Sequence, residues 1–227
     1  MNYFISDLHL GHKNCLAFDN RPFTSITEHD NQIIENWNHQ VNPTDDVYLL
    51  GDISWYDADK TAKIFKELNG NIHLIKGNHD GKLLKNRELR NRFCEVTDYK
   101  ELYIGSKTGI VLCHYPIPCF RNHHHGWYHF YGHVHNSAED ELMKQIKRQI
   151  INQHNVPCNM YNVGCMIPYM MYTPQTFDYI VSSENKGIIK KNCADIFNIN
   201  NSVNANVICL GKSMGGKGFD GKRICLM

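Results

Sequence analysis

Short apolar runs recur along the chain, and most of them end in a cluster of polar side chains. Runs rich in apolar and aromatic residues occupy residues 3–5, 47–50, 72–75, 110–113 and 129–131. Their length favours buried β-strands over helices. Residues 102–104 and 110–113 flank a Gly-Ser-Lys-Thr-Gly turn and predict a hairpin. Residues 160–164 predict a further strand and turn.

Helical periodicity lies between these strands. Residues 28–40 carry an apolar stripe at helical spacing, after a segment, 27–30, that resembles a capping box. His29 and His39 are expected at the surface of this helix. Asp57 is expected to cap a second helix, which connects two of the short strands and so predicts a parallel α/β pair. Further helices are expected over residues 81–92 and 137–154.

The composition narrows the class of protein. The 227 residues are 42% hydrophobic and carry a net charge of +1, which indicates a globular core and argues against a general electrostatic nucleic-acid binder. No apolar stretch approaches the roughly 18–20 residues of a membrane span, and the N-terminus lacks the features of a signal peptide. Nine cysteines without a C-x-x-C pair favour reduced thiols. We therefore expect a cytoplasmic protein that has no membrane partner.

The polar clusters stand at the carboxyl ends of five predicted strands. Ligands of open α/β sheets bind beyond these ends. The densest cluster is Gly-Asn-His-Asp at residues 77–80, directly after a buried strand. The candidate residues at the five ends are Asp7 and His9, Asp52, Asn78 and His79, His114, and His133 and His135.

Oxygen and imidazole ligands without cysteine suit manganese, iron, zinc or cobalt better than a thiolate-bound structural zinc. The set is larger than one ion needs, and two ions that share a carboxylate would use it. Each cluster taken alone is also ordinary turn chemistry. The metal hypothesis therefore depends on all five clusters occurring together.

In their order along the chain, the clusters resemble the motif series of the calcineurin-like metallophosphoesterases. The blocks Asp-x-His, Gly-Asp, Gly-Asn-His-Asp, a lone His and Gly-His-x-His lie within residues 3–135, and the likeness extends to about residue 180. The segment Arg-Pro-Phe at 21–23 looks like the small single-domain phosphoesterases of bacteria and phages. The resemblance implies a four-layer α-β-β-α sandwich, with two mixed sheets face to face and helices outside.

The resemblance covers a metallophosphoesterase domain at residues 1–181. Residues 182–227 are rich in Asn and Gly and contain no histidine. We expect them to form a C-terminal extension, either flexible or added to the domain, that is dispensable for the chemistry.

Position by position, the resemblance implies a role for each residue. His79 would face the substrate as general acid or as a stabiliser of phosphoryl charge, and Asp80 would orient His79. A hydroxide that bridges the two ions would attack the phosphorus in line. One ion would be bound by Asp7, His9, Asp52 and His135, and the other by Asp52, Asn78, His114 and His133, with Asp52 bridging.

The implied activity is hydrolysis of a phosphomonoester or phosphodiester, with the diester favoured. Nucleotides and nucleic-acid ends are among the substrates that the resemblance implies. The implied cofactors are two divalent ions, manganese first, with iron, zinc, nickel or cobalt as alternatives. The alternative function is a catalytically silent metal-binding interaction module with the same fold. Such proteins usually lack a ligand or the histidine of the Gly-Asn-His block, whereas this chain retains them all.

Two further residues are candidates for substrate binding. His12 and Arg21 lie close in sequence to Asp7 and His9, and arginine suits bidentate contact with a phosphate. A surface position in the loop is the competing interpretation of each. The sequence carries no signal for an oligomeric state.

Overall fold

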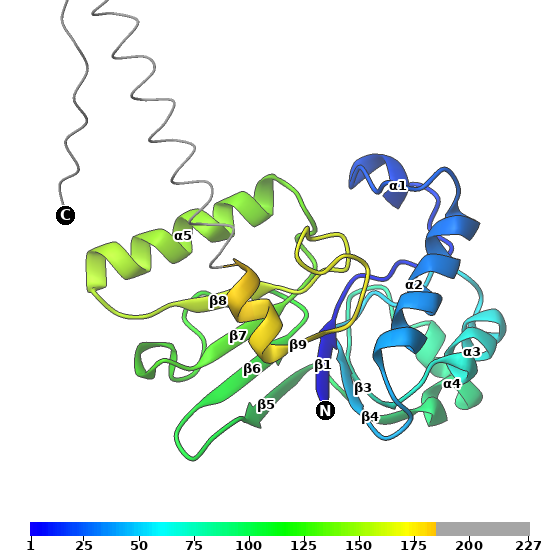
Figure 1. Cartoon of the computed structure of the whole chain (residues 1–227), viewed down its shortest axis with the longest axis horizontal. Coiled ribbons are helices and arrows are strands. Elements are labelled where there is room, and N and C mark those ends of the chain that lie inside the picture. The colour runs from blue at the N-terminus through cyan, green and yellow to red at the C-terminus, as the bar shows by residue number, and fades with distance from the viewer. Residues whose placement is uncertain (185–227) are drawn as a thin grey trace, which may run out of the picture. The chain divides into compact units, whose positions relative to one another are not determined.

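Two mixed β-sheets, packed face to face, form the centre of the protein (Figure 1). The computed structural model describes residues 1–184, which form one unit. One sheet has the strand order β4-β3-β2-β1-β9 and the other the order β5-β6-β7-β8. The strands are β1 (Asn2–Ile5), β2 (Asp46–Leu49), β3 (Asn71–Ile75), β4 (Phe93–Thr97), β5 (Tyr99–Tyr103), β6 (Gly109–Cys113), β7 (Tyr128–Tyr131), β8 (Asn159–Asn162) and β9 (Gln175–Thr176).

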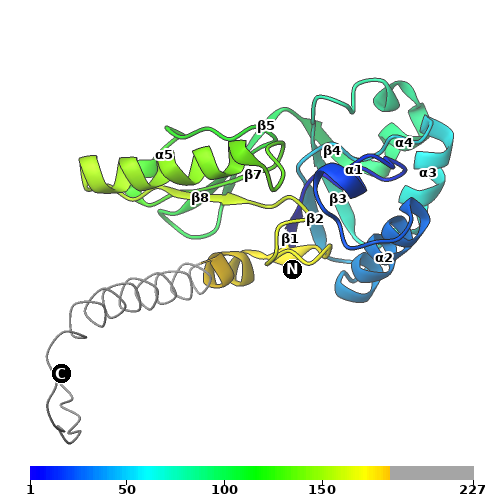
Figure 2. The same ribbon diagram turned by 90° about the horizontal axis from the view of Figure 1, so that it is seen from above.

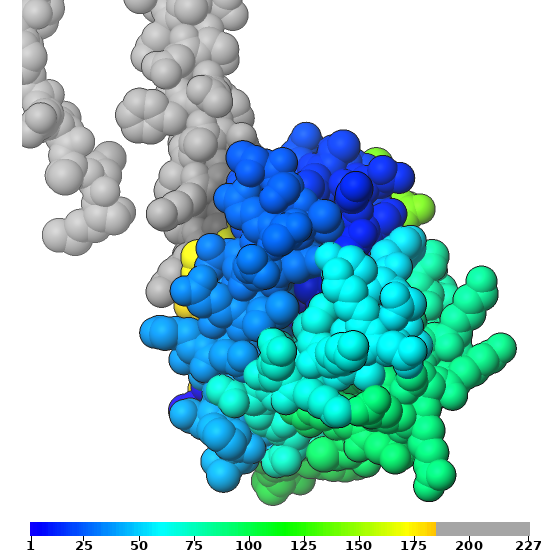
Figure 3. All heavy atoms as spheres, turned by 90° about the vertical axis from the view of Figure 1, so that its right-hand side faces the viewer, coloured from blue at the N-terminus to red at the C-terminus, as the bar shows by residue number. Residues whose placement is uncertain are grey.

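Helices cover the outer faces of both sheets. Figure 2 shows α5 along the second sheet, with α2, α3 and α4 on the far side of the first. In the space-filling view, the surfaces of α2 in blue and α3 in cyan lie side by side on the face that is shown (Figure 3). The predicted α/β sandwich is thus confirmed. The labelled helices are α1 (Cys15–Phe18), α2 (Ile26–Gln40), α3 (Ala58–Glu67), α4 (Arg87–Arg92) and α5 (Ala138–His154), with 3₁₀ turns η1 (Leu83–Lys85) and η2 (His123–His125). Residues 177–184 are helical as well.

The parallel strands explain why the polar clusters meet. Strands β1, β2, β3 and β4 run parallel, as do β6, β7 and β8, whereas β9 and β5 pair antiparallel with their neighbours. Between the two sheets, the ring of Phe4 on β1 meets the edge of Phe130 on β7, at 4.9 Å between ring centroids. Burial of these apolar faces fixes the sheets together, so the loops after β1, β2, β3, β6 and β7 open toward one another.

Several local predictions are confirmed and others are wrong. The β5–β6 hairpin forms, and Asp57 caps α3 by accepting a hydrogen bond from the Lys60 amide. The N-cap of α2 is Ser25, whose hydroxyl accepts from the Glu28 amide, so the capping box predicted at 27–30 is misplaced. Residues 81–92 form the separate short helices η1 and α4 instead of one helix, and β4 and β9 were not predicted.

Within residues 1–184, no helix combines the length and the apolar character needed to cross a bilayer. The six cysteines described there are free thiols. Of the extension predicted for residues 182–227, the part from residue 185 onward lies outside the described residues.

Candidate metal centre

Five of the seven candidate ligands line one cavity between the ends of the two sheets, and the other two, Asp7 and His114, are fully buried next to them. The cavity has a volume of about 510 Å³. The loops after β1, β2 and β3 contribute from one sheet, and the loop after β7 contributes from the other. The residues that line it are His9, His12, Phe18, Asp19, Asp52, Trp55, Asn78, His79, His133, Val134, His135, Ser137 and Glu139.

Two groups of ligand atoms lie at its floor. In the first, atoms of Asp7, His9 and His135 lie within 4.8 Å of one another, and in the second atoms of Asp7, Asp52 and His114 do so. The nitrogens His9 Nε2 and His135 Nε2 are 3.0 Å apart, and each is 3.8–3.9 Å from Asp7 Oδ1. Atoms bound to one ion at about 2.0–2.2 Å stand roughly 3–4 Å apart, so these separations fit a shared ion.

Asp52 lies between the two groups. Its Oδ2 is 3.8 Å from His9 Nε2 and 3.7 Å from His114 Nε2. Its Oδ1 accepts a hydrogen bond from the His79 amide. Both oxygens of Asp7, in comparison, accept from the His133 amide. Asp7 belongs to both groups of ligand atoms. The Oδ2 atom of Asp52 faces one imidazole of each group, His9 in the first and His114 in the second.

The hydrogen-bond pattern fits a cation among these atoms. His114 Nδ1 lies 2.6 Å from the Leu50 carbonyl and must donate to it, so Nε2 presents a lone pair. That lone pair faces Asn78 Oδ1 at 3.2 Å and the Asp52 carboxylate. Acceptors that face one another repel unless a cation lies between them. The donor set, which contains oxygen and imidazole nitrogen only, suits a divalent transition metal.

Burial keeps two of the imidazoles neutral. It lowers the pKa of His9 well below its usual value, and the neighbouring His135 and Arg21 lower that pKa further. Burial also lowers the pKa of His133, as does the nearby His114. Because neutral imidazoles have a free lone pair, this shift favours metal binding.

The backbone of the site is strained. Asp7, His9, Asp52, His133 and His135 all have φ between 49° and 68°. This left-handed region is costly for residues with a Cβ and is often concentrated at functional sites. Through this local conformation His9 lines the cavity and the fully buried Asp7 lies beside it, with Oδ1 3.9 Å from His9 Nε2.

Two glycines allow the ligand loops to approach closely. A Cβ on Gly77 would lie 2.2 Å from Asp52 Oδ1, and one on Gly132 would lie 2.4 Å from Asp7 Oδ2. Both distances are shorter than any non-bonded contact. The glycines before Asn78 and His133 are therefore needed for access to the carboxylates as well as for the turns.

The structure corrects the role expected for Asp80. Its carboxylate is fully buried and accepts from three backbone amides, those of Asp52, Ile53 and Gly77. These bonds fasten the loop after β2 to the loop after β3, so Asp80 positions Asp52 and does not orient the His79 ring. The His79 side chain is 47% exposed and its ring lies against that of Trp55, at 4.3 Å between centroids.

Arg21 was expected to contact substrate, and this expectation is also wrong. Its side chain is fully buried and donates to Asp19, to the carbonyls of Asp7 and Leu8, and to Cys165 Sγ. A phosphate in the cavity cannot reach a guanidinium so enclosed. His12 does line the cavity, with its ring stacked on Trp55 at 4.1 Å and an interplanar angle of 7°.

The surface position expected for His29 is also wrong. This residue is buried, not at the surface, because its ring lies between the Arg21 guanidinium and the Asp30 carboxylate. His39 is exposed as expected. Sequence reasoning also missed Asp19 and Trp55 as cavity residues. Trp55 could have been suspected from its place three residues after Asp52, whereas no local signal distinguishes Asp19.

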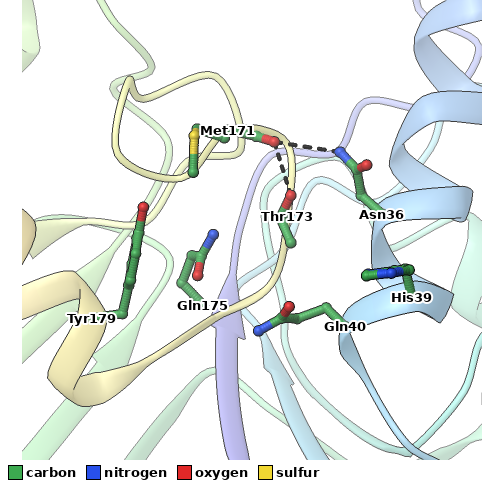
Figure 4. A pocket seen from close by; sticks show the side chains of 7 residues that line it. All are labelled: Asn36, His39, Gln40, Met171, Thr173, Gln175 and Tyr179. Atoms are coloured by element: carbon green, nitrogen blue, oxygen red, sulfur yellow. Dashed lines mark hydrogen bonds between the residues drawn. The ribbon is translucent and has the colours of Figure 1, made fainter.

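A second cavity, of about 370 Å³, lies between α2 and the segment around β9 (Figure 4). It is lined by one histidine, by amides and by neutral side chains, with no carboxylate among them. It therefore offers no ligand set comparable to that at the strand ends. Its lining residues are Asn36, His39, Gln40, Met171, Thr173, Gln175 and Tyr179.

Comparison with known families gives one match that spans most of the chain. The family model described as calcineurin-like phosphoesterase matches residues 3–170. This range contains every candidate metal ligand, strands β2 to β8 and all of β1 except Asn2.

Individual relatives come from an archaeon and from phages. An uncharacterized protein of Methanocaldococcus jannaschii is 32% identical over 196 residues, which cover 86% of this chain and 97% of the relative. The Gene 66 protein of Mycobacterium phage L5 is 30% identical over 132 residues, which cover 50% of this chain and 62% of the phage protein. Among solved structures, a protein of unknown function from Aquifex aeolicus aligns with a TM-score of 0.49 and 25% identity, over 77% of this chain and 94% of that one.

Proposed function

The chain belongs to the calcineurin-like phosphoesterase family, and from this premise we propose that it hydrolyses a phosphodiester at a centre of two divalent ions. The family implies a metal-dependent phosphoesterase. The number of ions, their identity as manganese and the preference for diesters are our proposals. We further propose that the substrate is a nucleotide or a nucleic-acid end.

The observation that carries the proposal is the position of Asp52 Oδ2. Three imidazole nitrogens, those of His9, His114 and His79, lie 3.7–3.9 Å from this one buried oxygen. We propose that Asp52 is the shared ligand and that Asp7, His9 and His135 complete one site. Asn78, His114 and His133 would complete the other.

When bound, two divalent ions would polarise the phosphoryl oxygens and supply a nucleophile from water near neutral pH. The remaining chemistry falls to side chains. The buried floor excludes bulk water from the phosphoryl group, which strengthens every electrostatic contact there. His79, on the exposed rim, would donate a proton to the leaving oxygen. His12, stacked on Trp55, would contact the phosphate or the group attached to it.

The proposal is tested by metal stoichiometry and turnover together. The full chain, loaded with Mn²⁺ and desalted, is expected to retain two ions by elemental analysis and to hydrolyse bis(4-nitrophenyl) phosphate faster than 4-nitrophenyl phosphate. Asp52→Asn is expected to lower both the stoichiometry and turnover. Asp46→Asn is the matched control, because Asp46 lies at the opposite end of the same strand and should leave both unchanged.

Three results would contradict parts of the proposal. A single ion per chain would refute the shared-carboxylate arrangement. Faster turnover of the monoester would refute the diester preference. Two bound ions without turnover on mono- and diesters, with or without added Mn²⁺, would favour the silent binding module.

A further inference from the structure

A buried chain of charged groups leads away from His135 and connects it to α2. His135 Nδ1 lies 2.9 Å from both oxygens of Asp19. The side chain of Asp19 is 2% exposed, and an ionised carboxylate can only accept hydrogen bonds. A proton of His135 therefore sits on Nδ1, and Nε2 is the ring atom directed at His9 and Asp7, where it is free to bind a metal ion once one is present.

Asp19 is in turn held by Arg21. The Nε and Nη2 atoms of Arg21 donate to Asp19 Oδ2 at 2.9 and 2.8 Å, as a fork on one oxygen. The same guanidinium donates to the Asp7 carbonyl at 3.1 Å. Arg21 thus joins the loop that carries Asp7 to the group that holds His135, although 128 positions separate these two candidate ligands along the chain.

The next two residues of this network are His29 and Asp30. Their hydrogen bonds are satisfied by only one arrangement of protons. Arg21 Nη1 must donate to His29 Nε2, at 2.8 Å, so His29 carries its proton on Nδ1 and donates it to Asp30 at 2.7 Å. The other oxygen of Asp30 accepts from the Gly11 amide and the Tyr56 hydroxyl. Each of these donors has an acceptor. Replacing one aspartate of the network by asparagine would therefore leave a donor facing another donor.

The structure assigns to Asp19 the role of a positioning residue that fixes the tautomer and direction of His135 toward a bound metal ion, with Arg21 as the residue that fixes Asp19. This inference rests on the proposed metal centre. A carboxylate behind a metal-bound imidazole orients the ring and raises its basicity, and loss of such a partner typically lowers metal affinity about 10–100-fold.

The exchange Asp19→Asn gives a sharp test because of Arg21. The single oxygen of the amide is claimed by the Arg21 fork, so the amide NH₂ group faces His135 Nδ1. A donor at the Oδ1 position, 2.9 Å from Nδ1, favours Nδ1 as an acceptor, and the proton then moves to Nε2, where it blocks the ligand position. A comparable loss of the productive tautomer follows the same exchange in a Ser-His-Asp triad.

The experiment uses the full chain, stripped with a chelator and titrated with Zn²⁺ in a calorimeter, with the histidine tautomers read by ¹⁵N NMR of the zinc-loaded and stripped protein. The wild type is expected to carry the His135 proton on Nδ1. Asp19→Asn is expected to bind zinc about 10–100-fold more weakly and to carry that proton on Nε2. Asp45→Asn is the matched control, since Asp45 is another buried carboxylate held by polar partners, and it should keep the wild-type affinity.

Zinc affinity unchanged in Asp19→Asn, or weakened with the proton still on Nδ1, would overturn the assignment. If the variant does not fold, the spectrum of the zinc-loaded wild type still decides, because a His135 proton on Nε2 in that form is incompatible with the assignment. None of these measurements requires hydrolysis, so the assignment of Asp19 can fail or stand independently of the proposed phosphodiesterase activity.

Discussion

Replacement of Asp80 by alanine is expected to destabilise the protein strongly, although Asp80 does not itself line the cavity. Its carboxylate accepts from the amides of Gly77, Asp52 and Ile53 at 2.7, 3.1 and 3.0 Å. The amides of Asp52 and Ile53 belong to buried residues, and Gly77 is half-buried. Asp80→Ala removes the acceptor of all three.

The magnitude follows from the cost of unpaired donors. A buried donor without its acceptor costs about 1–3 kcal/mol, so three of them cost about 4 kcal/mol in free energy of unfolding, allowing for partial access of water to Gly77. For a protein of this size, about 2–4 °C of melting temperature accompanies each kcal/mol, which gives a loss of about 12 °C. The released Asp52 amide also frees the Asp52 carboxylate to turn, so metal affinity should fall.

The assay is thermal denaturation followed by circular dichroism, with excess chelator and again with saturating Mn²⁺. The chelated measurement isolates the lost hydrogen bonds, because bound metal would add stability of its own. Asp98→Ala is the control, since its side chain is 80% exposed and forms an ion pair with Lys76 at the surface. A chelated Asp80→Ala protein that melts within about 3 °C of wild type would refute the hydrogen-bond argument.

Three other predictions concern separate parts of the protein. His79→Ala should keep both ions yet lose about 10²–10⁴-fold in turnover on an alkyl phosphodiester, and much less on a nitrophenyl ester, which leaves without a proton; an equal loss on both would exclude the general-acid role. Burial lowers the pKa of His129 from 6.5 to about 4, so the neutral form stabilises the native state above pH 6.5. As the pH falls from 6.5 to 4, about 3 kcal/mol of this stability should be lost, and His129→Gln should flatten the dependence in urea titrations. A chain that ends at Glu184 contains every candidate ligand and should retain the turnover of the full chain; a folded but inactive product would show that the following residues serve the site.

Most of the local structure could be predicted from the sequence. Strands β1, β2, β3, β6 and β7 are short runs in which nearly every side chain is apolar or aromatic, and such runs have few alternatives to a buried strand. The glycines and acids that follow them are turn residues, so the ends of the strands could be placed as well. The candidate metal ligands came from this same pattern, since each follows its strand directly.

The predictions that failed depend on contacts between distant segments. Arg21 and His29 look like surface residues in any local window, yet they are buried because Asp19 and Asp30 neutralise them in a network that closes only when α2 packs on the sheet. Asp80 follows His79 in sequence, but the three amides that it binds come from two loops.

The tertiary structure alone decided which residues support the centre. Ligands are recognised by residue type and spacing, because a metal ion selects for both. A supporting residue is selected only for the atom it must reach, and that atom lies elsewhere in the chain. Asp19 illustrates the difference: it is one aspartate among many in the sequence, and it becomes the partner of His135 through a contact across 116 positions that hydrophobic packing of the two sheets brings about.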